Sequence, residues 1–295
     1  MNGLLIVNKP TDFTSFDVVA VLRKLCGTKK IGHMGTLDPM AIGVLPILIG
    51  SAAKAQQFMP DHDKEYIAAL RFGIETDTLD ITGKIISEKS SDVSLNDLTE
   101  ALTHFRGNIM QVPPMYSAIK KDGKRLYELA REGITADIPP RPVTIHELEL
   151  LSFNQNEQTA EIRVLCSKGT YIRSICRDIG LLLGYGAVMT SLCRTKACGF
   201  SLEDSHTLEQ LREAADITKL IIPTEKLFDI YRSAAVTPAQ ATRFKNGGNL
   251  DIARISRFEI KNDNELIRVY DRDGGFIGLG KVNMALNELC FQKLF

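Results

Sequence analysis

The chain has 295 residues, 44% of them hydrophobic and 24% charged, a composition that excludes a mainly disordered protein. Its 36 Lys and Arg balance 36 Asp and Glu, which argues against a protein that binds polyanions over its whole surface. Only residues 101–200 are net positive, with 13 basic against 9 acidic side chains. This excess is compatible with one basic face and equally with scattered, solvated charge.

Cysteine usage and apolar runs indicate the compartment. The six cysteines include no Cys-x-x-Cys pair and no histidine completes a zinc ligand set, so we interpret them as reduced core thiols. The first nine residues lack the apolar run of a secretion signal, and no segment reaches the roughly 20 apolar residues that span a bilayer. We therefore expect a cytoplasmic protein without a membrane segment.

The first elements are short strands and one helix around a glycine-rich loop. Residues 4–7 are typical of a buried strand, and residues 15–26 show helical spacing that ends at a glycine. The loop over residues 28–43 follows. Apolar residues 44–49 and the alternating residues 66–72 then predict two strands.

The middle of the chain mixes helices and strands without regular alternation. Residues 94–105 begin with a capping-box-like Ser94-x-x-Asp97 and are predicted to be helical, as are residues 124–132. Residues 159–166 alternate like a strand, and a further helix begins after it with Thr170 as the expected N-cap. The predicted class is therefore α+β with a largely antiparallel mixed sheet.

The C-terminal part has a different pattern. Residues 205–228 are predicted to be helical and polar until Pro223 breaks them. Residues 268–270 and 276–279, joined by Asp273-Gly274-Gly275, predict a hairpin. We expect a small β-rich domain and divide the chain into domains at residues 1–228 and 229–295.

Asp38 is the first candidate for chemistry. An aspartate before proline is held extended, and nearby glycines let the chain turn close to a ligand, although an isolated Asp-Pro usually only shapes a turn. The loop lacks the Gly-Lys-Ser or Gly-Lys-Thr ending of a phosphate-binding loop and is no dinucleotide fingerprint. Asp77 and Asp80, three apart in a turn, are interpreted as solvated carboxylates and not as a metal site.

Arg173 is the second candidate. It lies in the first turn of a predicted helix, where the helix dipole disfavours a cation, so a carboxylate such as Asp38 would suit as its partner. A surface arginine with Asp178 nearby is an equally compatible interpretation. An aspartate paired with arginine stays ionised, and its carboxylate can act as a nucleophile.

Residues 32–43, Gly-His-Met-Gly-Thr-Leu-Asp-Pro-Met-Ala-Ile-Gly, closely resemble the catalytic motif of the TruB family of tRNA pseudouridine-55 synthases. The resemblance is strong over residues 3–200. Beyond them, Phe244-Lys245-Asn246-Gly247 and Gly278-Leu279-Gly280 resemble the small C-terminal PUA domain of the family more loosely. One departure is Asp12, near a place where the family commonly has glycine. Further matches occur in order along the chain: Asn8-Lys9-Pro10, Thr14-Ser15, Lys64-Glu65-Tyr66, Thr76-Asp77-Thr78 with Asp80 and Gly83, residues 112–118 and residues 167–173.

The resemblance implies a pseudouridine synthase catalytic domain followed by a PUA-like RNA-binding domain. It implies an enzyme that flips uridine 55 out of the T loop of tRNA, detaches the base, rotates it and rejoins it through carbon 5. Neither a cofactor nor a metal is expected, because the reaction is an isomerisation. Asp38 would be the nucleophile, attacking either ribose carbon 1′ or the base. Arg173 would keep Asp38 ionised and oriented, and Tyr66 would stack on the extruded base and move a proton.

The resemblance also implies a set of substrate-binding residues. His33 would push into the T loop to support base extrusion, and Leu192 would form an apolar wall. Without the motif, Tyr66 would be interpreted as an ordinary sheet tyrosine. The expected partner is the T arm of tRNA, bound by a monomer that requires no protein partner. The remaining substrate-binding candidates are Tyr171, Lys9 and Asp80.

Two other functions fit parts of the sequence. A non-catalytic RNA-binding or RNA-folding protein would use the basic middle third, but the intact Asp38 motif argues against this as the sole role. A guide-RNA-dependent synthase of the related archaeal and eukaryotic branch would be expected to carry extensions, whereas the first motif lies almost at residue 1. We therefore favour a stand-alone enzyme of the bacterial type.

Overall fold

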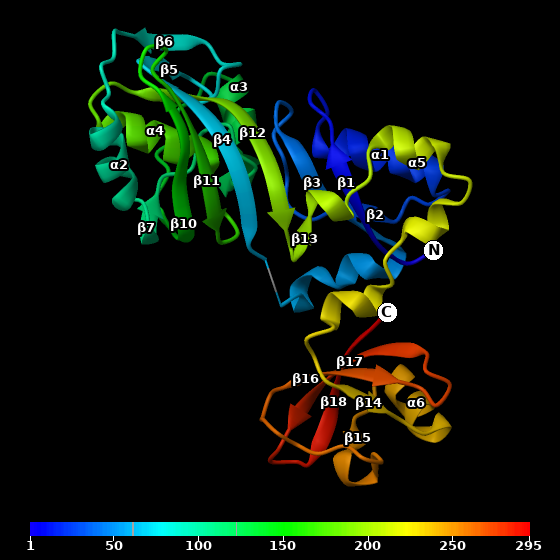
Figure 1. The fold of residues 1–295 in the computed structure, drawn as a ribbon. Coiled ribbons are helices and arrows are strands. Elements are labelled where there is room, and N and C mark those ends of the chain that lie inside the picture. Colours follow the sequence, from blue (N-terminus) through cyan, green and yellow to red (C-terminus); the bar gives the residue numbers. More distant parts are fainter. Residues whose placement is uncertain (61, 122) are drawn as a thin grey trace.

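The computed structural model describes residues 1–60, 62–121 and 123–295, and contains a large sheet with its helices and a small sheet below it (Figure 1). The strands are β1 Gly3–Lys9, β2 Ile31–His33, β3 Ile42–Ile49, β4 Lys64–Phe72, β5 Ile74–Thr76, β6 Ile85–Glu88, β7 Gly107–Gln111, β8 Lys120–Lys121, β9 Lys124–Arg125, β10 Arg141–Asn154, β11 Thr159–Cys166, β12 Ala187–Ala197, β13 Phe200–Ser201, β14 Ser233–Ala235, β15 Leu250–Asp251, β16 Leu266–Tyr270, β17 Phe276–Asn283 and β18 Glu288–Leu294. The α-helices are α1 Ser15–Leu25, α2 Leu95–Thr103, α3 Leu126–Arg131, α4 Ile172–Leu182, α5 Leu208–Glu213 and α6 Pro238–Lys245.

The large sheet has the order β1-β3-β12-β4-β11-β10-β7, with β2 paired to β3 and β13 to β12. Neighbouring strands are antiparallel except β12 and β3, which run parallel. The α+β class with a largely antiparallel mixed sheet is therefore confirmed. No helix within the described ranges is long and apolar enough to cross a bilayer.

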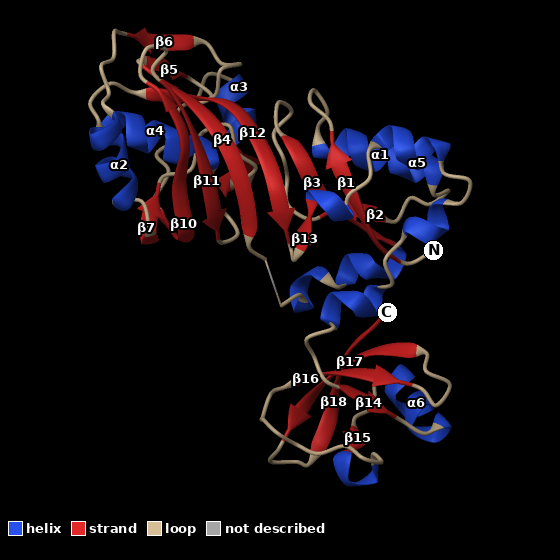
Figure 2. Ribbon diagram, in the orientation of Figure 1, coloured by secondary structure: helices blue, strands red, loops and turns tan. Residues whose placement is uncertain are grey.

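One face of the large sheet is covered by helices α1, α2, α4 and α5, whose apolar side chains share a single core with the strands (Figure 2). Strand β4 shows how the sequence builds this core. Tyr66, Ala68, Leu70 and Phe72 are buried in it, while the alternate residues of the strand face the other way, as the two-residue period of a strand requires. This alternation is the one expected from the sequence.

The C-terminal sheet, in the order β14-β16-β17-β18-β15, has a core of its own that includes Phe244, Ile267 and Leu289. The predicted hairpin is present as the antiparallel pair β16 and β17. A β-rich C-terminal domain is thus confirmed. It contacts the rest of the chain through an aromatic cluster, which we define as Phe58, Phe228, Tyr231, Phe276 and Phe295.

Three local expectations need correction. The N-cap of α4 is Tyr171 and not Thr170, whose hydroxyl instead donates to the Ser167 carbonyl at 2.9 Å. The segment 205–228 forms only the short helical pieces Leu208–Glu213, Ile217–Leu220 and Thr224–Phe228. Phe16, at helical spacing with the buried side chains of α1, is 59% exposed. Cys166, Cys176 and Cys198 are buried, while the other three cysteines are only half-buried.

Asp12, the departure from the family motif, adopts a left-handed backbone with φ of 61°. Glycine reaches this conformation without a steric penalty, and aspartate is one of the few other residues that tolerate it. The Asp12 N–H donates to the Pro39 carbonyl at 2.9 Å, so the turn is tied to the Asp38 loop. The backbone shape needed at this place is therefore compatible with aspartate.

Candidate active site

A cleft of about 1570 Å³ lies between the loop that follows β2, strands β4 and β12, and the first turn of α4. Its volume exceeds the roughly 300–1,000 Å³ of a typical small-molecule pocket, so it suits a macromolecular substrate. Lys9 and His33 lie outside it. The other site residues expected from the sequence all line the cleft: Asp38, Arg173, Tyr66, Leu192, Tyr171 and Asp80.

The cleft is strongly basic although the chain carries no formal net charge. Only three carboxylates line its described part, those of Asp12, Asp38 and Asp80. A concave surface lined by one sign of charge concentrates the field and attracts an oppositely charged ligand. The basic charge is therefore gathered where a polyanion would enter. Eight basic side chains line the same part: Lys54, Lys64, Arg125, Arg131, Lys168, Arg173, Arg194 and Lys293.

The loop that carries Asp38 is held by contacts from two neighbouring elements. The Ser15 hydroxyl accepts from the Leu37 N–H at 2.9 Å and lies 3.3 Å from the Leu37 carbonyl, while the Leu37 side chain is buried. The Lys9 ammonium donates to the Pro39 carbonyl at 3.1 Å. Both flanks of Asp38 are thus fixed, and its carboxylate, about one-third exposed, faces the cleft.

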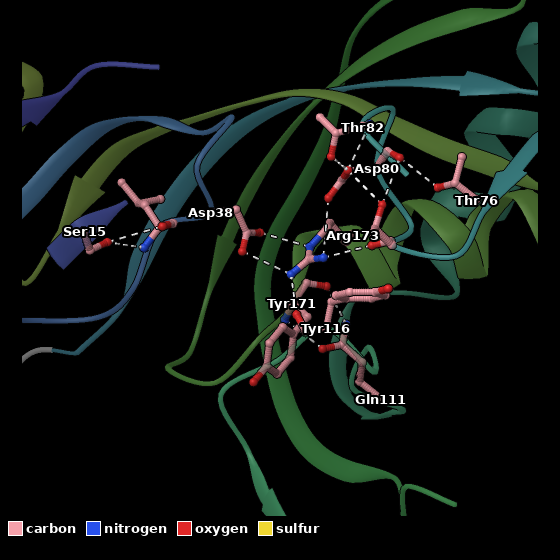
Figure 3. A network of polar contacts seen from close by, with 11 residues as sticks. Ser15, Asp38, Thr76, Asp80, Thr82, Gln111, Tyr116, Tyr171 and Arg173 are labelled. Carbon is pink, nitrogen blue, oxygen red and sulfur yellow. Dashed lines mark hydrogen bonds and ion pairs between the residues drawn. The ribbon is translucent and has the colours of Figure 1, made fainter. Parts of the chain in front are cut away.

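Arg173, near the start of α4, holds that carboxylate at two points (Figure 3). Its Nε lies 3.0 Å from Asp38 Oδ2, and its Nη2 donates to Asp38 Oδ1 at 3.1 Å. The remaining N–H groups donate to the carbonyls of Thr78 and Tyr116, both at 2.9 Å, and Nη1 lies 3.4 Å from Asp80 Oδ2. Because the buried guanidinium is engaged on every side, its position relative to Asp38 is fixed.

Asp80 supports Arg173 and does not present a free carboxylate to the cleft. Its Oδ1 accepts from the Thr78 hydroxyl at 2.9 Å and from the Thr82 hydroxyl and N–H at 2.5 and 3.1 Å. Its Oδ2 faces Arg173, and the side chain is 6% exposed. These contacts suit a residue that positions Arg173, and the binding of substrate by Asp80, which lines the cleft, stays a prediction. The described residues contain no group of three or more His, Cys, Asp or Glu that could hold a metal ion.

The electrostatic environment of Asp38 has two opposing parts. Burial in the cleft raises the pKa of the Asp38 carboxyl above its ordinary value, because desolvation disfavours the charged form. The Arg173 guanidinium lowers the pKa, and the Asp80 carboxylate raises it again. The result is a carboxylate that is poorly solvated and neutralised mainly by one rigid partner, which is a suitable state for a nucleophile.

Tyrosine rings and apolar side chains shape the rest of the cleft, among them Tyr66, Tyr171 and Leu192. Tyr66 on β4 is 7% exposed, and Leu192 on the adjacent β12 is 6% exposed. Tyr171 is held by Gln111, whose side-chain amide accepts from the Tyr171 N–H at 2.8 Å and donates to its carbonyl at 3.1 Å. The family motif predicted Tyr171 as a site residue, but no pattern in the sequence predicts that Gln111 holds it.

Lys9 and His33, two of the residues expected at the substrate, do not line the cleft. Lys9 is fully buried, and its ammonium donates to the carbonyls of Pro10, Phe13 and Pro39 at 2.8, 2.6 and 3.1 Å, so it secures loops and has no donor left for substrate. Burial lowers its pKa to about 8. His33 is half-buried on β2, paired with Ile47 of β3 beside the cleft and not within it.

The comparisons with known proteins agree with this geometry. Residues 23–172 match the model of the TruB family pseudouridylate synthase N-terminal domain, and residues 173–229 match that of the tRNA pseudouridylate synthase B C-terminal domain. A tRNA pseudouridine synthase B of Clostridium tetani is 44% identical over 282 residues, 95% of this chain and 96% of that protein. The chain belongs to the TruB family of pseudouridylate synthases.

Further relatives extend the likeness over the whole chain. A tRNA pseudouridine synthase B of Clostridioides difficile is 41% identical over 99% of this TruB family chain and 98% of its own. A solved structure, a Cbf5-Nop10-Gar1 complex, contains a chain that is 26% identical with a TM-score of 0.71, covering 99% of this chain and 84% of that one. The H/ACA RNP bound to a substrate RNA containing 2′-deoxyuridine, 24% identical with a TM-score of 0.71, shows the same fold.

In this TruB family chain, sequence reasoning missed a group of cleft residues in the segment around α3. The guanidiniums of Arg125 and Arg131 lie 5.8 and 5.5 Å from the ring centroid of Tyr127, and all three side chains line the cleft. Such cation–π contacts hold long basic side chains in place. In the sequence these residues fall in a stretch rich in Lys and Arg from Lys120 to Arg131. Such a stretch indicates a local excess of positive charge but does not indicate a cleft.

Proposed function

We propose that this chain isomerises uridine 55 in the T loop of tRNA to pseudouridine, with Asp38 as its nucleophile. The observation that carries the proposal is the two-point pairing of Asp38 with Arg173 in a large basic cleft. The pairing supplies a fixed, ionised carboxylate, and the basic lining supplies affinity for RNA. A pseudouridine synthase belonging to the TruB family needs both.

The apolar part of the cleft fits a base that has left its stack. An extruded base requires an aromatic face and a pocket that excludes water, and Tyr66 and Leu192 offer these on adjacent strands. Tyr171, anchored by Gln111, borders the same space. In our proposal Tyr66 stacks on the uracil and moves a proton, while Leu192 forms the opposite wall.

The chemistry begins at the Asp38 carboxylate. It attacks either carbon 1′ of the ribose or the uracil ring, and both routes require the ionised form that Arg173 favours. The base then separates, rotates and rejoins through carbon 5. Because substrate and product are isomers, the overall reaction consumes no oxidant, reductant or group donor. In our proposal the enzyme therefore needs no cofactor.

The other expected site residues take supporting roles in this proposal. Asp80 orients Arg173, and Lys9 ties the Asp38 loop to the turn at residues 10–13. His33 lies beside the cleft on β2, where it contacts the T loop as the base leaves the stack. We propose this last role on position alone.

We further propose that residues 229–295 form a separate RNA-contacting domain and residues 1–228 the catalytic one. Lys293 of β18 lines the same cleft as Asp38, together with Lys54 and Gln57 from the segment between β3 and β4. The RNA would therefore pass from the C-terminal domain to the catalytic loop along one continuous basic surface. In our proposal a monomer does this in the cytoplasm without a protein partner.

The decisive experiment is to incubate the pure protein with unmodified tRNA transcript and to map pseudouridine at nucleotide resolution. Product at the single T-loop uridine, without guide RNA or a second protein, is the expected result. Product that appears only with a guide RNA would favour a guide-dependent synthase. Tight tRNA binding and refolding without product would favour a protein that only remodels RNA.

A further inference from the structure

Arg194 on β12 is a fully buried cation that has no carboxylate partner within ion-pair distance among the described residues. Its Nε donates to the Val44 carbonyl at 2.6 Å and its Nη2 to the Gly35 carbonyl at 3.2 Å. Its Nη1 is shielded from solvent and finds no hydrogen-bond partner in the described part of the chain. Burying such a charge is costly unless an anion compensates it at some stage of the protein's cycle.

Two glycines of the catalytic motif lie against Arg194, Gly43 against its backbone and Gly35 near its guanidinium. Gly43, with φ of 106°, pairs with Arg194 across β3 and β12, and a Cβ at Gly43 would lie 2.3 Å from the Arg194 carbonyl oxygen. A Cβ at Gly35 would lie 3.6 Å from Arg194 Nη1 and 3.2 Å from the Lys64 side chain. The loop that presents Asp38 is thus packed directly on Arg194.

The group facing Arg194 from the other neighbouring strand is Tyr66, its direct partner in the β12 and β4 register. Side chains of directly opposed residues lie on the same face, about 5 Å apart at Cβ. Arg194 and Tyr66 both line the cleft, and Arg194 Nη1 is closed to solvent. An ionised Tyr66 would supply the missing anion.

We propose that Arg194 is a positioning residue that acts through Tyr66, holding the phenol oxygen and stabilising its ionised form during proton transfer. The proposal rests on the proposed function, because the proton in question is the one on carbon 5 of the rejoined uracil. The tyrosine oxygen accepts this proton: the carbon–hydrogen bond breaks, its electron pair enters the ring, and an O–H bond forms. The phenol then returns a proton to nitrogen 1, so no proton is gained or lost overall.

The groups around Tyr66 set its ionisation. Burial raises the pKa of the phenol, and the Arg194 guanidinium lowers it. The Asp38 carboxylate on the catalytic loop acts in the raising direction, because a nearby anion disfavours the phenolate, and Cys166 on β11 would do so only as a thiolate. Arg194 is therefore the neighbour that favours the phenolate, and removing its charge leaves only groups that oppose ionisation.

The test compares the full-length protein with Arg194→Gln, Arg194→Lys, Tyr66→Phe and the Arg194→Gln, Tyr66→Phe double variant. Single-turnover rates are measured at saturating protein between pH 6 and 9, on tRNA carrying hydrogen or deuterium at carbon 5 of uridine. Arg106→Gln is the control for loss of an arginine that donates to backbone, because the exposed Arg106 donates two N–H groups to the Leu148 carbonyl and lies outside the cleft lining. Each variant's rate is divided by the wild-type rate at the same pH. Because all of the proteins contain Lys9, the effect of its ionisation on the rate cancels in this ratio.

The expected loss for Arg194→Gln at pH 7 is roughly tenfold or more, the range for a charge-assisted hydrogen bond. The loss should shrink as pH rises, the carbon-5 isotope effect should exceed that of the wild type, and Arg194→Lys should restore part of the rate. In the Tyr66→Phe background, Arg194→Gln should add no further loss. A loss that is constant with pH and leaves the isotope effect unchanged would show that Arg194 has only a structural role and would overturn the proposal.

A buried arginine can be needed for folding, so circular dichroism and thermal unfolding accompany every variant. If Arg194→Gln does not fold, incorporation of 3-fluorotyrosine at position 66 in the otherwise unchanged protein decides the matter, because fluorine lowers the phenol pKa. The rate profile should then move to lower pH, and an unmoved profile would overturn the proposal. Absence of any product from the wild type would instead refute the proposed function.

Discussion

The Arg173 guanidinium and the Asp38 carboxylate meet at two points, Nε to Oδ2 at 3.0 Å and Nη2 to Oδ1 at 3.1 Å, although 134 residues separate them along the chain. A two-point pair fixes orientation as well as charge, because the planar guanidinium matches the plane of the carboxylate. Asp38 is therefore presented to the cleft in one direction, with its ionised form favoured by Arg173.

Asp38→Asn should abolish turnover and leave tRNA affinity within about tenfold, or about 1.4 kcal/mol, of the wild type. The amide occupies the same space but cannot form the covalent bond expected of a nucleophile. Pseudouridine mapping and filter binding on the same preparation measure the two quantities. Substantial turnover by the variant would remove Asp38 from its assigned role.

Arg173→Ala should lower the single-turnover rate by roughly 10²- to 10³-fold, the range for breaking a buried ion pair. The substitution leaves Asp38 and Asp80 facing each other without a cation, so the thermal midpoint should fall as well. Arg177→Ala is the control on the same helix, because Arg177 pairs with Asp178 and lies outside the cleft lining. A fully active Arg173→Ala protein would contradict the role assigned to the pair.

The rate should decline on the acid side at a higher pH than for an exposed aspartate. Burial raises the pKa of Asp38, so protonation, which removes the nucleophile, begins at a higher pH. Arg173→Lys keeps the charge but weakens the two-point pairing, which should raise the pKa further and move the decline to still higher pH. Single-turnover rates from pH 4.5 to 7.5 measure both positions, and a shift toward lower pH in the variant would be the wrong sign.

Activity should persist in excess EDTA, because an isomerisation by a carboxylate nucleophile calls for no metal. The tRNA itself folds with magnesium, so its structure must be preserved with a polyamine and verified by chemical probing. Loss of product that is restored by zinc or magnesium, with the tRNA shown to be folded throughout, would contradict this expectation.

Lys293→Ala should weaken tRNA binding and lower the slope of log affinity against log salt by about one unit, since one phosphate contact is lost. The rate at saturating tRNA should change little, because Lys293 is remote in sequence and element from the catalytic loop. Lys261→Ala, an exposed change in the same domain outside the cleft lining, is the control. An unchanged salt slope with a collapsed saturating rate would place Lys293 in the chemistry instead.

Substitution is preferable to truncation for this test. The aromatic cluster joins the two domains, and the Tyr231 hydroxyl donates to the Phe58 carbonyl at 2.9 Å. Removing residues 229–295 would expose Phe228, which is fully buried, and its apolar neighbours to water. The remaining protein should lose stability for a reason unrelated to RNA.

The sequence predicted the features that depend on local patterns, such as strands and motif residues. It did not predict the features that depend on tertiary contacts. The alternation of apolar residues predicted β4. The family motif predicted Asp38, and the motif together with the helix dipole predicted Arg173 as its partner. Thr170 was the wrong N-cap because Gln111, about 60 residues away, fixes Tyr171 instead. The family motif predicted that Lys9 binds substrate. A motif indicates that a residue is important, but it does not indicate the direction in which the side chain points.

Arg194 is a site residue that the sequence did not predict. Nothing in the local sequence distinguishes it from a surface arginine of an alternating strand, and only the packing of Gly35 and Gly43 against it shows why it is buried. From the sequence the two glycines could be interpreted as a source of loop flexibility. In the structure, Gly43 lets β3 approach the backbone of β12 closely, and Gly35 lies beside the Lys64 and Arg194 side chains.

Glu65 and Tyr66 are neighbours on β4 and therefore face opposite sides of the sheet. Glu65 accepts from Arg163 of β11 at 2.8 Å and from Thr195 and Lys196 of β12 at 2.8 and 3.2 Å, and Arg163 also reaches Glu149 of β10. These bonds tie the central strands together on the side away from the tyrosine. In amide hydrogen exchange, β4, β11 and β12 should therefore open only with global unfolding. Residues 117–121 and 123–133, which form the two-residue strands β8 and β9 and the short helix α3, should exchange through local openings of lower free energy.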